Sequence, residues 1–376
     1  MKILLLDMDG VLLTPQGYHK ALQETVRLLA QTLGFGDKTL SDEDIAAFEA
    51  VGITNEWDSS AISTALMLME VWRHDSQATY PSAINSDSIA NHALKFPEFA
   101  PFFQIMESTR ANSSAPLERA QEAMTNLSQA VSTENQSRLL EILLNAHNID
   151  QALSKRVFQE LVLGSQKYSE IYKRESVLDT DSYLLKHDRS NIPAELHKRL
   201  LKWLKVKNQH AVIFTNRPSL FPNCNSGEPE AEIGAKLVGL EQLPYVAFGG
   251  LTWLAGELGM SNQELIKPSP VHALAAMRMA LGDEIESALM AGAKLVHDGS
   301  DDGKWQVLDG FEVSVFEDSI GGVLSLKAAQ KVLNAHGVKI NTKAYGISQA
   351  KTKQAALSQQ GAEVYPTFCE GLLQVL

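Results

Sequence analysis

Short, mainly apolar runs occur at a few places along the chain, and polar residues follow each of them. The runs lie at 3–6, 211–214 and 313–316. A strand in the middle of a parallel sheet has this pattern, because helices cover both of its faces. In open α/β sheets, ligands bind at the carboxyl ends of the strands, so the polar residues after these runs are the first candidates for a functional site.

The stretch between the first and second runs has apolar residues at helical spacing instead. Ser41, which precedes a cluster of acidic residues, and Asn55 stand where helix N-caps would. The predicted helices cover 42–50, 56–73, 117–131, 134–147 and 150–163, and polar residues predict turns at 85–88 and 108–115. Because strand-like alternation does not persist anywhere in this stretch, we predict an all-helical insertion.

Helix-like and strand-like segments alternate after residue 191. Pro193 precedes a predicted helix that ends at Leu204, and near the C-terminus the predicted order is strand 345–347, helix 348–360, strand 362–365 and helix 367–375. This alternation is typical of a parallel α/β sheet. The sequence therefore predicts two domains, an α/β core formed by 1–15 and 193–376 and a helical domain formed by 16–192. A chain of 376 residues is long enough for both.

The overall composition limits the kinds of partner more than it limits the fold. The chain is 44% apolar and has a formal net charge of −12, which disfavours binding to nucleic acid or to an anionic membrane. A small anionic substrate is still compatible with this charge, because a bound cation reverses the local potential. Cys224 and Cys369 are far apart, and no segment has the length of a signal peptide or a membrane span. We therefore expect a cytoplasmic protein without disulfides or a zinc site, and we make no prediction about its oligomeric state.

The residues after the first apolar run are two closely spaced acids, Asp7 and Asp9, followed by Gly10. If the chain turns at Gly10, both carboxylates reach the same small volume. Two confined negative charges repel each other, so either one takes up a proton or a cation neutralises them. Hard oxygen ligands with little space suit Mg²⁺. The alternative is a pair of solvated acids at the start of a loop.

Four segments, in chain order, resemble the four motifs of the haloacid dehalogenase superfamily. They are Asp7-Met8-Asp9-Gly10-Val11-Leu12, Phe214-Thr215, Lys267-Pro268-Ser269-Pro270 and Phe316-Glu317-Asp318-Ser319-Ile320-Gly321-Gly322-Val323. The resemblance covers residues 1–15 and 193–376 and implies a three-layer Rossmannoid core. The helical insertion would then be a cap domain placed between the first and second motifs.

The resemblance also implies roles for individual residues. Asp7 would attack a phosphoryl group and form an aspartyl-phosphate, and Asp9 would act as the general acid and then the general base. Thr215 would offer its hydroxyl, and a neighbouring backbone N–H, to a phosphoryl oxygen. Lys267 would offset negative charge on the phosphoryl group and on Asp7.

For the metal, the resemblance implies Mg²⁺ bound by Asp7, Asp318 and the backbone carbonyl of Asp9. Glu317 would be a further ligand or would support one. We also place Gly10, Asn216 and Arg217 next to the phosphate or the substrate, although Arg217 could equally be a surface residue. Each residue alone has an ordinary structural explanation, and it is their joint occurrence in order that supports these roles.

The predicted activity is Mg²⁺-dependent hydrolysis of a small phosphorylated metabolite. Asp9 favours ester chemistry, since superfamily members that cleave carbon–halogen bonds generally lack this second acid. A phosphomutase or phosphotransferase would use the same motifs and remains an alternative, as does a non-catalytic binding protein that retains the fold. A nicotinamide-dependent dehydrogenase is disfavoured because no GxGxxG segment follows the first predicted strand.

Three further segments have two interpretations each. The acidic, glycine-rich segment 297–303 could be a metal loop but is more typical of a turn between strands. The segment 52–58 could face the active site or could simply cap a helix with Trp57 packed against it. The cluster of Tyr168, Tyr172, Lys173 and Arg174 suits a phosphorylated substrate, or a solvated helix face, equally well.

Overall fold

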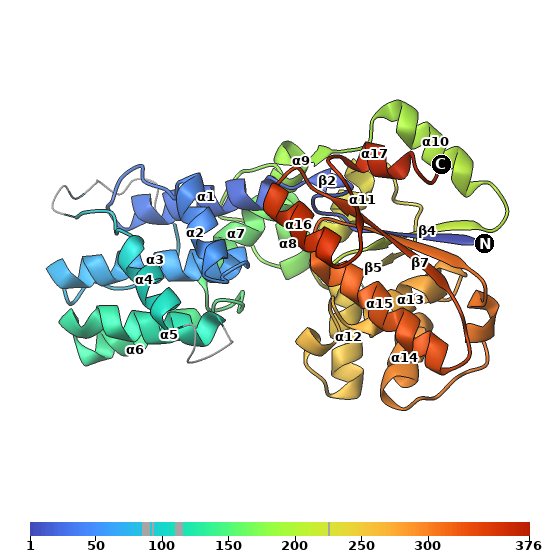
Figure 1. Ribbon diagram of the computed structural model, residues 1–376. Helices are drawn as coiled ribbons and strands as arrows, with labels where there is room; N and C mark the ends of the chain where they lie inside the picture. The colour runs from blue at the N-terminus through green and yellow to red at the C-terminus, as the bar shows by residue number, and fades with distance from the viewer. Residues whose placement is uncertain (85–90, 92–93, 110–115, 225) are drawn as a thin grey trace. The chain divides into compact units, whose positions relative to one another are not determined.

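The computed structural model describes residues 1–84, 91, 94–109, 116–224 and 226–376 (Figure 1). The chain forms two compact units, one made of Met1–Pro15 and Asp188–Leu376 and the other of Gln16–His187. The return to the first unit therefore comes five residues before the expected boundary at 193. The reason is local pairing, because β2 (Leu13–Thr14) and β3 (Arg189–Ser190) form an antiparallel ladder beside the two chain crossings.

The first unit contains a six-stranded sheet in the order β5-β4-β1-β6-β7-β8. All neighbouring strands of this sheet are parallel. The strands are β1 (Lys2–Leu6), β4 (Gln209–Phe214), β5 (Tyr245–Val246), β6 (Glu312–Glu317), β7 (Asn341–Ile347) and β8 (Glu363–Tyr365). The predicted fold class, an α/β protein with a parallel sheet and an added helical domain, is confirmed.

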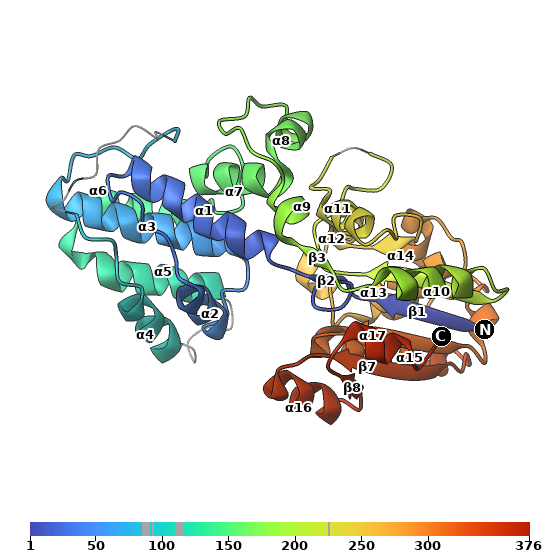
Figure 2. The same cartoon turned by 90° about the horizontal axis from the view of Figure 1, so that it is seen from above.

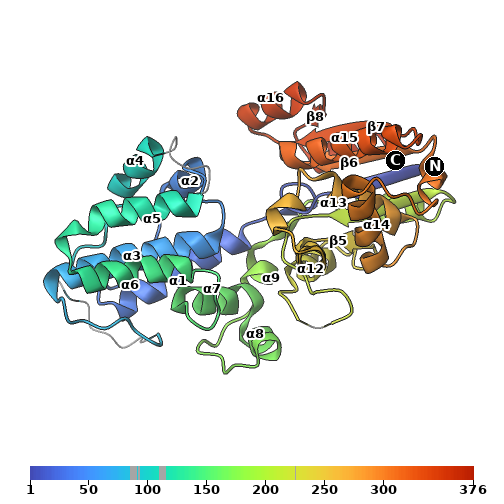
Figure 3. The same ribbon diagram turned by 90° about the horizontal axis from the view of Figure 1, so that it is seen from below.

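Helices cover both faces of the sheet, because alternate residues of each buried strand point to opposite sides. In β1, Ile3 and Leu5 belong to one apolar core, and Leu4 and Leu6 to the other. The first core is closed by α12 (Phe248–Leu258), α13 (Pro270–Ala280), α14 (Ile285–His297) and α15 (Ile320–Ala335). The second is closed by α10 (Ala194–Leu204), α11 (Glu230–Leu237) and α17 (Phe368–Leu372). Figure 2 views this unit from the side of α10 and α17, and Figure 3 views it from the side of α12 to α14.

The regular elements among the described residues of the second unit are all helices, including a short 3₁₀ helix (Ser128–Ala130). Its helices are α1 (Gly17–Thr32), α2 (Asp42–Ala50), α3 (Glu56–His74), α4 (Ala100–Ser108), α5 (Pro116–Leu127), α6 (Thr133–Leu144), α7 (Leu153–Leu163), α8 (Ser165–Tyr172) and α9 (Tyr183–His187). Both predicted N-caps are confirmed, since Ser41 accepts a hydrogen bond from the N–H of Asp44 and Asn55 accepts one from that of Trp57. The turn expected at 85–88 and most of the one at 108–115 fall outside the described residues.

Two helices were predicted near the C-terminus. The one at 348–360 is α16 (Lys351–Gln359), and the one at 367–375 is shorter than predicted, with only the five residues of α17. In the part of the chain that the structure describes, none of the helices has the combination of length and apolar sequence that a membrane span requires.

Candidate active site

The carboxyl ends of three adjacent strands bring the expected site residues together. Asp7 directly follows β1, Thr215 directly follows β4, and Asp318 directly follows β6. Since β4 and β6 are the two neighbours of β1 and all three run in the same direction, these ends lie at one edge of the sheet. This is the edge at which open α/β sheets bind ligands.

Lys267 connects two of the acidic residues at this edge. Its ammonium nitrogen lies 2.7 Å from Oδ1 of Asp7 and 2.5 Å from Oε1 of Glu317, and its side chain is 5% exposed. The same nitrogen lies 4.2 Å from the ring centre of Phe214, at the end of β4. Lys267 is thus held in place among buried groups, which is unlike the solvated surface lysine that its sequence context alone would suggest.

The electrostatics of this cluster follow from burial. Burial raises the pKa of Asp7 well above its ordinary value, the charge of Glu317 raises it further, and Lys267 opposes both effects. Burial also raises the pKa of Glu317, against the lowering effect of Lys267. For Lys267, burial lowers the pKa, but Asp7 and Glu317 outweigh it and raise the pKa overall. One lysine therefore stabilises two carboxylates incompletely, and more positive charge would be favourable here.

Asp318 completes a group of three carboxylates that fits a divalent cation. One ligand oxygen each from Asp7, Glu317 and Asp318 lies within 4.8 Å of the others. A set of hard oxygen donors of this kind suits Mg²⁺. Both oxygens of Glu317 already accept hydrogen bonds, from Lys267 and from the hydroxyl of Ser319 at 3.0 Å. Asp7 and Asp318 are therefore the better candidates for direct coordination of a cation, and Glu317 is a candidate for a supporting role.

Two glycines allow the acidic residues to approach one another. Gly10 has φ of +74°, and a Cβ there would lie 2.7 Å from the carboxyl group of Asp318. Gly322, in the first turn of α15, lies against Glu317 so closely that a Cβ would overlap its carboxylate. Each glycine therefore leaves space for a carboxylate of the cluster, which gives a physical reason for Gly10 next to the site.

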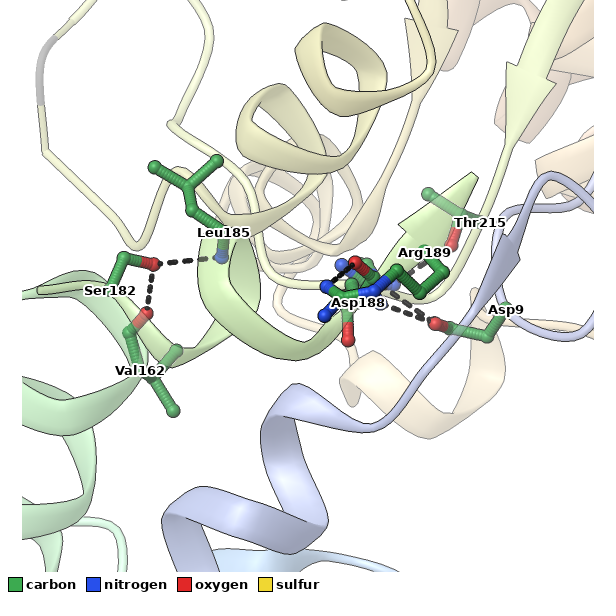
Figure 4. Close-up of polar contacts among 8 residues, drawn as sticks. Asp9, Val162, Ser182, Leu185, Asp188, Arg189 and Thr215 are labelled. Carbon is green, nitrogen blue, oxygen red and sulfur yellow. Dashed lines mark hydrogen bonds and ion pairs between the residues drawn. The ribbon is translucent and has the colours of Figure 1, made fainter. Parts of the chain in front are cut away.

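The carboxylate of Asp9 is bound by Arg217 and is not one of these three. The Nε of Arg217 lies 3.0 and 2.9 Å from the two oxygens of Asp9, and its Nη2 lies 2.5 Å from Oδ1. The Nη2 also donates to Asp188 at 2.8 Å. Figure 4 shows Asp9 and Asp188 with these contacts as dashed lines. The side chain of Asp9 is therefore not part of the group of three carboxylates, and the predicted contact of its backbone carbonyl with the metal stays a prediction.

Arg217 is not a surface residue, because its side chain is 1% exposed and is bound to two carboxylates. The expected contact of Arg217 with a substrate phosphate stays a prediction. The backbone N–H of Arg217 donates to the hydroxyl oxygen of Thr215 at 3.2 Å, and the N–H of Thr215 itself donates to the carbonyl of Val246. The hydroxyl hydrogen of Thr215 can still be offered to a phosphoryl oxygen. Asn216, between them, is exposed at the same strand end.

Sequence reasoning missed two charged residues of this region. Asp188 is 1% exposed and pairs with Arg217, but no apolar run or motif marks it. Lys353, in α16, lies 2.7 Å from Oδ2 of Asp318 and occurs in a helix of mainly polar sequence. No pattern in the sequence assigns partners to these residues, because both contacts join positions far apart in the chain.

The acidic, glycine-rich segment at 297–303 has a structural role. It begins at the end of α14 and leads to a short 3₁₀ helix (Trp305–Leu308). The segment therefore joins two helices, and the predicted turn between strands is wrong. Both oxygens of Asp302 accept hydrogen bonds from Arg278, at 3.0 and 2.9 Å. Arg278 also contacts the ring of Trp305. This segment is therefore engaged in packing and does not have the arrangement of a metal loop.

The two candidate clusters of the helical unit are also satisfied internally. Trp57 donates from its indole N–H to Gln159 at 3.1 Å and carries the ammonium of Lys155 3.9 Å above its ring. Tyr168 is buried, with its ring centre 5.1 Å from that of Tyr172. Arg174 pairs with Asp150. Helix capping and packing account for these residues within their own unit.

Comparisons with known proteins bear on the fold alone. No family model and no curated protein matches the chain. A crystal structure solved as a target of the Northeast Structural Genomics Consortium is 19% identical, with a TM-score of 0.67, over 100% of this chain and 98% of that one. Phosphatase Tt82 from Thermococcus thioreducens is 13% identical, with a TM-score of 0.44, over 95% of this chain and 99% of that one. The first similarity indicates a shared fold, and the second is too distant to support an argument.

Proposed function

We propose that this protein is a Mg²⁺-dependent phosphatase that hydrolyses a small phosphomonoester through an aspartyl-phosphate on Asp7. The observation that carries the proposal is the cluster at the ends of β1 and β6, where Asp7 contacts Lys267 and lies beside Asp318 and Glu317. A buried carboxylate whose charge is incompletely neutralised contributes little to stability. Next to a lysine, however, it is a suitable nucleophile for a phosphoryl group.

In the first step, a carboxylate oxygen of Asp7 attacks phosphorus, and the bond between phosphorus and the ester oxygen breaks. Asp9 gives its proton to the departing oxygen, so the alcohol leaves in neutral form. In the second step, Asp9 accepts a proton from water as the water oxygen attacks phosphorus. The bond between phosphorus and Asp7 then breaks, which returns the Asp7 carboxylate and releases inorganic phosphate.

The charged groups around Asp7 support both steps. Lys267 would stabilise negative charge on a phosphoryl oxygen as well as on Asp7, and the hydroxyl of Thr215 would donate to a second oxygen. Mg²⁺ held by Asp7 and Asp318 would supply further positive charge for the phosphoryl oxygens. Glu317 contributes by holding Lys267, since the two are 2.5 Å apart.

The helical unit has no established role, and we propose that it selects the substrate. A domain inserted directly after the first strand can exclude water from a site at that strand's end. The expected substrate is a small phosphorylated metabolite, because the net charge of −12 disfavours nucleic acids and anionic membranes.

The test is phosphate release from a panel of phosphate esters, with and without Mg²⁺, by the parent and by Asp7→Asn. The parent should require Mg²⁺ and lose activity in a chelator. Asp7→Asn should be inactive, because an amide oxygen is a far weaker nucleophile than a carboxylate, whereas the exposed Asp298→Asn should match the parent. When the reaction with an ester radiolabelled at phosphorus is quenched with acid, the label should be found on Asp7.

Several results would change the proposal. Turnover by Asp7→Asn at the parent rate would exclude Asp7 as the nucleophile. Label on Asp7 together with transfer to an added alcohol, and little release of phosphate, would indicate a phosphotransferase. Ester binding without turnover by any form of the protein would indicate a binding protein that retains the fold.

A further inference from the structure

The guanidinium of Arg217 lies between two carboxylates that are far apart in the sequence. It donates through Nε and Nη2 to Asp9, and through Nη2 to Asp188. The side chains of Arg217 and Asp188 are each 1% exposed, whereas that of Asp9 is 36% exposed. Of these three side chains, that of Asp9 is accessible to a small molecule, and those of Arg217 and Asp188 are buried.

The backbone of Arg217 is hydrogen-bonded through both its N–H and its carbonyl. Its backbone N–H donates to Thr215, and its carbonyl accepts from the N–H of Phe248 at 3.0 Å. A guanidinium is planar and presents its donors as a rigid fork, so a fixed Arg217 also fixes the orientation of the carboxylate that it binds. A lysine at this position would supply charge without that geometry.

The backbone next to Asp188 is anchored to the segment that follows Asp9. Asn191 donates from its backbone N–H to the carbonyl of Leu12 at 2.9 Å, and from its side chain to the carbonyl of Val11 at 3.0 Å. Asp188 is the residue at which the chain re-enters the α/β unit after the helical unit. Asp9 therefore lies on the segment that leads to the helical unit, and Asp188 lies on the segment that returns from it.

We propose that Arg217 and Asp188 are positioning residues for Asp9, with Arg217 orienting the acid–base carboxylate and Asp188 orienting Arg217. The inference rests on the proposed function. Three hydrogen bonds from the rigid guanidinium fix both oxygens of Asp9, so they set the direction in which its carboxylate faces. The orientation of the acid–base group matters most for an ester oxygen that is a poor leaving group, because that oxygen depends on proton transfer to leave.

The test uses two esters of nearly the same shape, phenyl phosphate and para-nitrophenyl phosphate, with Mg²⁺. The phenolate of the first needs a proton to leave, and that of the second scarcely does. Arg217→Lys and Asp188→Asn should lower kcat for phenyl phosphate by about tenfold or more and that for para-nitrophenyl phosphate by less than about threefold. Arg199→Lys, which makes the same change at an exposed site on α10, should leave both rates unchanged.

The decisive measurement repeats these variants in an Asp9→Asn background. If Arg217 and Asp188 act through Asp9, neither change should slow phenyl phosphate further there. Asp188→Glu, which keeps the charge but moves the carboxylate, should show the same dependence on the leaving group even if Asp188→Asn is unfolded. Equal losses on both esters, or full additional losses without Asp9, would overturn the inference alone. A parent that hydrolyses neither ester would overturn the proposed function, and the inference with it.

Discussion

The carboxylate of Glu317 occupies the position that a Cβ on Gly322 would take. Glu317 is fully buried, accepts a hydrogen bond from Lys267, and precedes α15 by three residues. The start of that helix therefore passes directly over a charged group of the site. The requirement for glycine at this position comes from the approach of a carboxylate and not from an unusual backbone angle.

Gly322→Ala should consequently destabilise the protein, because the added methyl group forces the Glu317 side chain or α15 to move. We expect a loss of about 1–3 kcal/mol in the free energy of unfolding, measured with chemical denaturant. The matched control is Gly256→Ala in α12, where a Cβ would meet nothing within 4 Å. That change should raise stability by about 0.5–1 kcal/mol, because alanine favours the helix. A Gly322→Ala protein as stable as the parent would contradict the packing described here.

His272 should make folding sensitive to moderate acid. Burial, and to a smaller extent Lys267, lowers the pKa of His272 from 6.5 to about 3. The unfolded chain therefore binds a proton that the folded chain refuses, so stability is lost as the pH falls from about 6.5 towards about 3.

The expected loss attributable to His272 is about 2 kcal/mol at pH 5 relative to pH 7.5. It is measured as the difference between the parent and His272→Gln, which does not titrate but keeps a donor for the carbonyl of Val246. Parallel pH profiles for the two proteins would show that His272 is not held neutral.

Lys353 should compete with a divalent cation for Asp318, since its ammonium lies 2.7 Å from Oδ2. Its side chain is 57% exposed, so the ion pair is weak. Lys353→Gln should tighten binding of Mg²⁺ by up to about fivefold, as measured by titration calorimetry. Lys351→Gln removes the same charge from the exposed start of the same helix and should have a smaller effect. Weaker cation binding by Lys353→Gln would instead show that this lysine supports the site.

The helical unit should be removable, because the two chain crossings are already paired. Thr14 lies opposite Arg189 in the β2–β3 ladder, so a short Asn-Gly turn can replace Gln16–His187 and close a hairpin. We expect a folded α/β unit that hydrolyses small aryl phosphates in the presence of Mg²⁺. Its preference among larger esters should fall by about tenfold or more if the helical unit selects the substrate. A folded unit with the parent's preferences would exclude that role.

Local patterns in the sequence determined much of this protein. The apolar runs at 3–6, 211–214 and 313–316 identified β1, β4 and β6, because strands covered on both faces need apolar residues throughout. Ser41 and Asn55 identified the starts of α2 and α3, since a cap bonds to residues next to it in the chain. The order of the strand ends was also enough to predict that Asp7, Thr215 and Asp318 lie at one edge.

Only the tertiary structure decided which charges pair. The sequence did not indicate that Arg217 pairs with Asp9, 208 positions away, and with Asp188. Lys353 and Asp318 likewise come together from different elements. Backbone conformation depends largely on nearby residues, and the buried face of a helix or strand repeats with the period of that element, so both leave patterns in the sequence. The partner of a charged side chain depends on which distant segments the packed sheet brings together, and no local pattern records that.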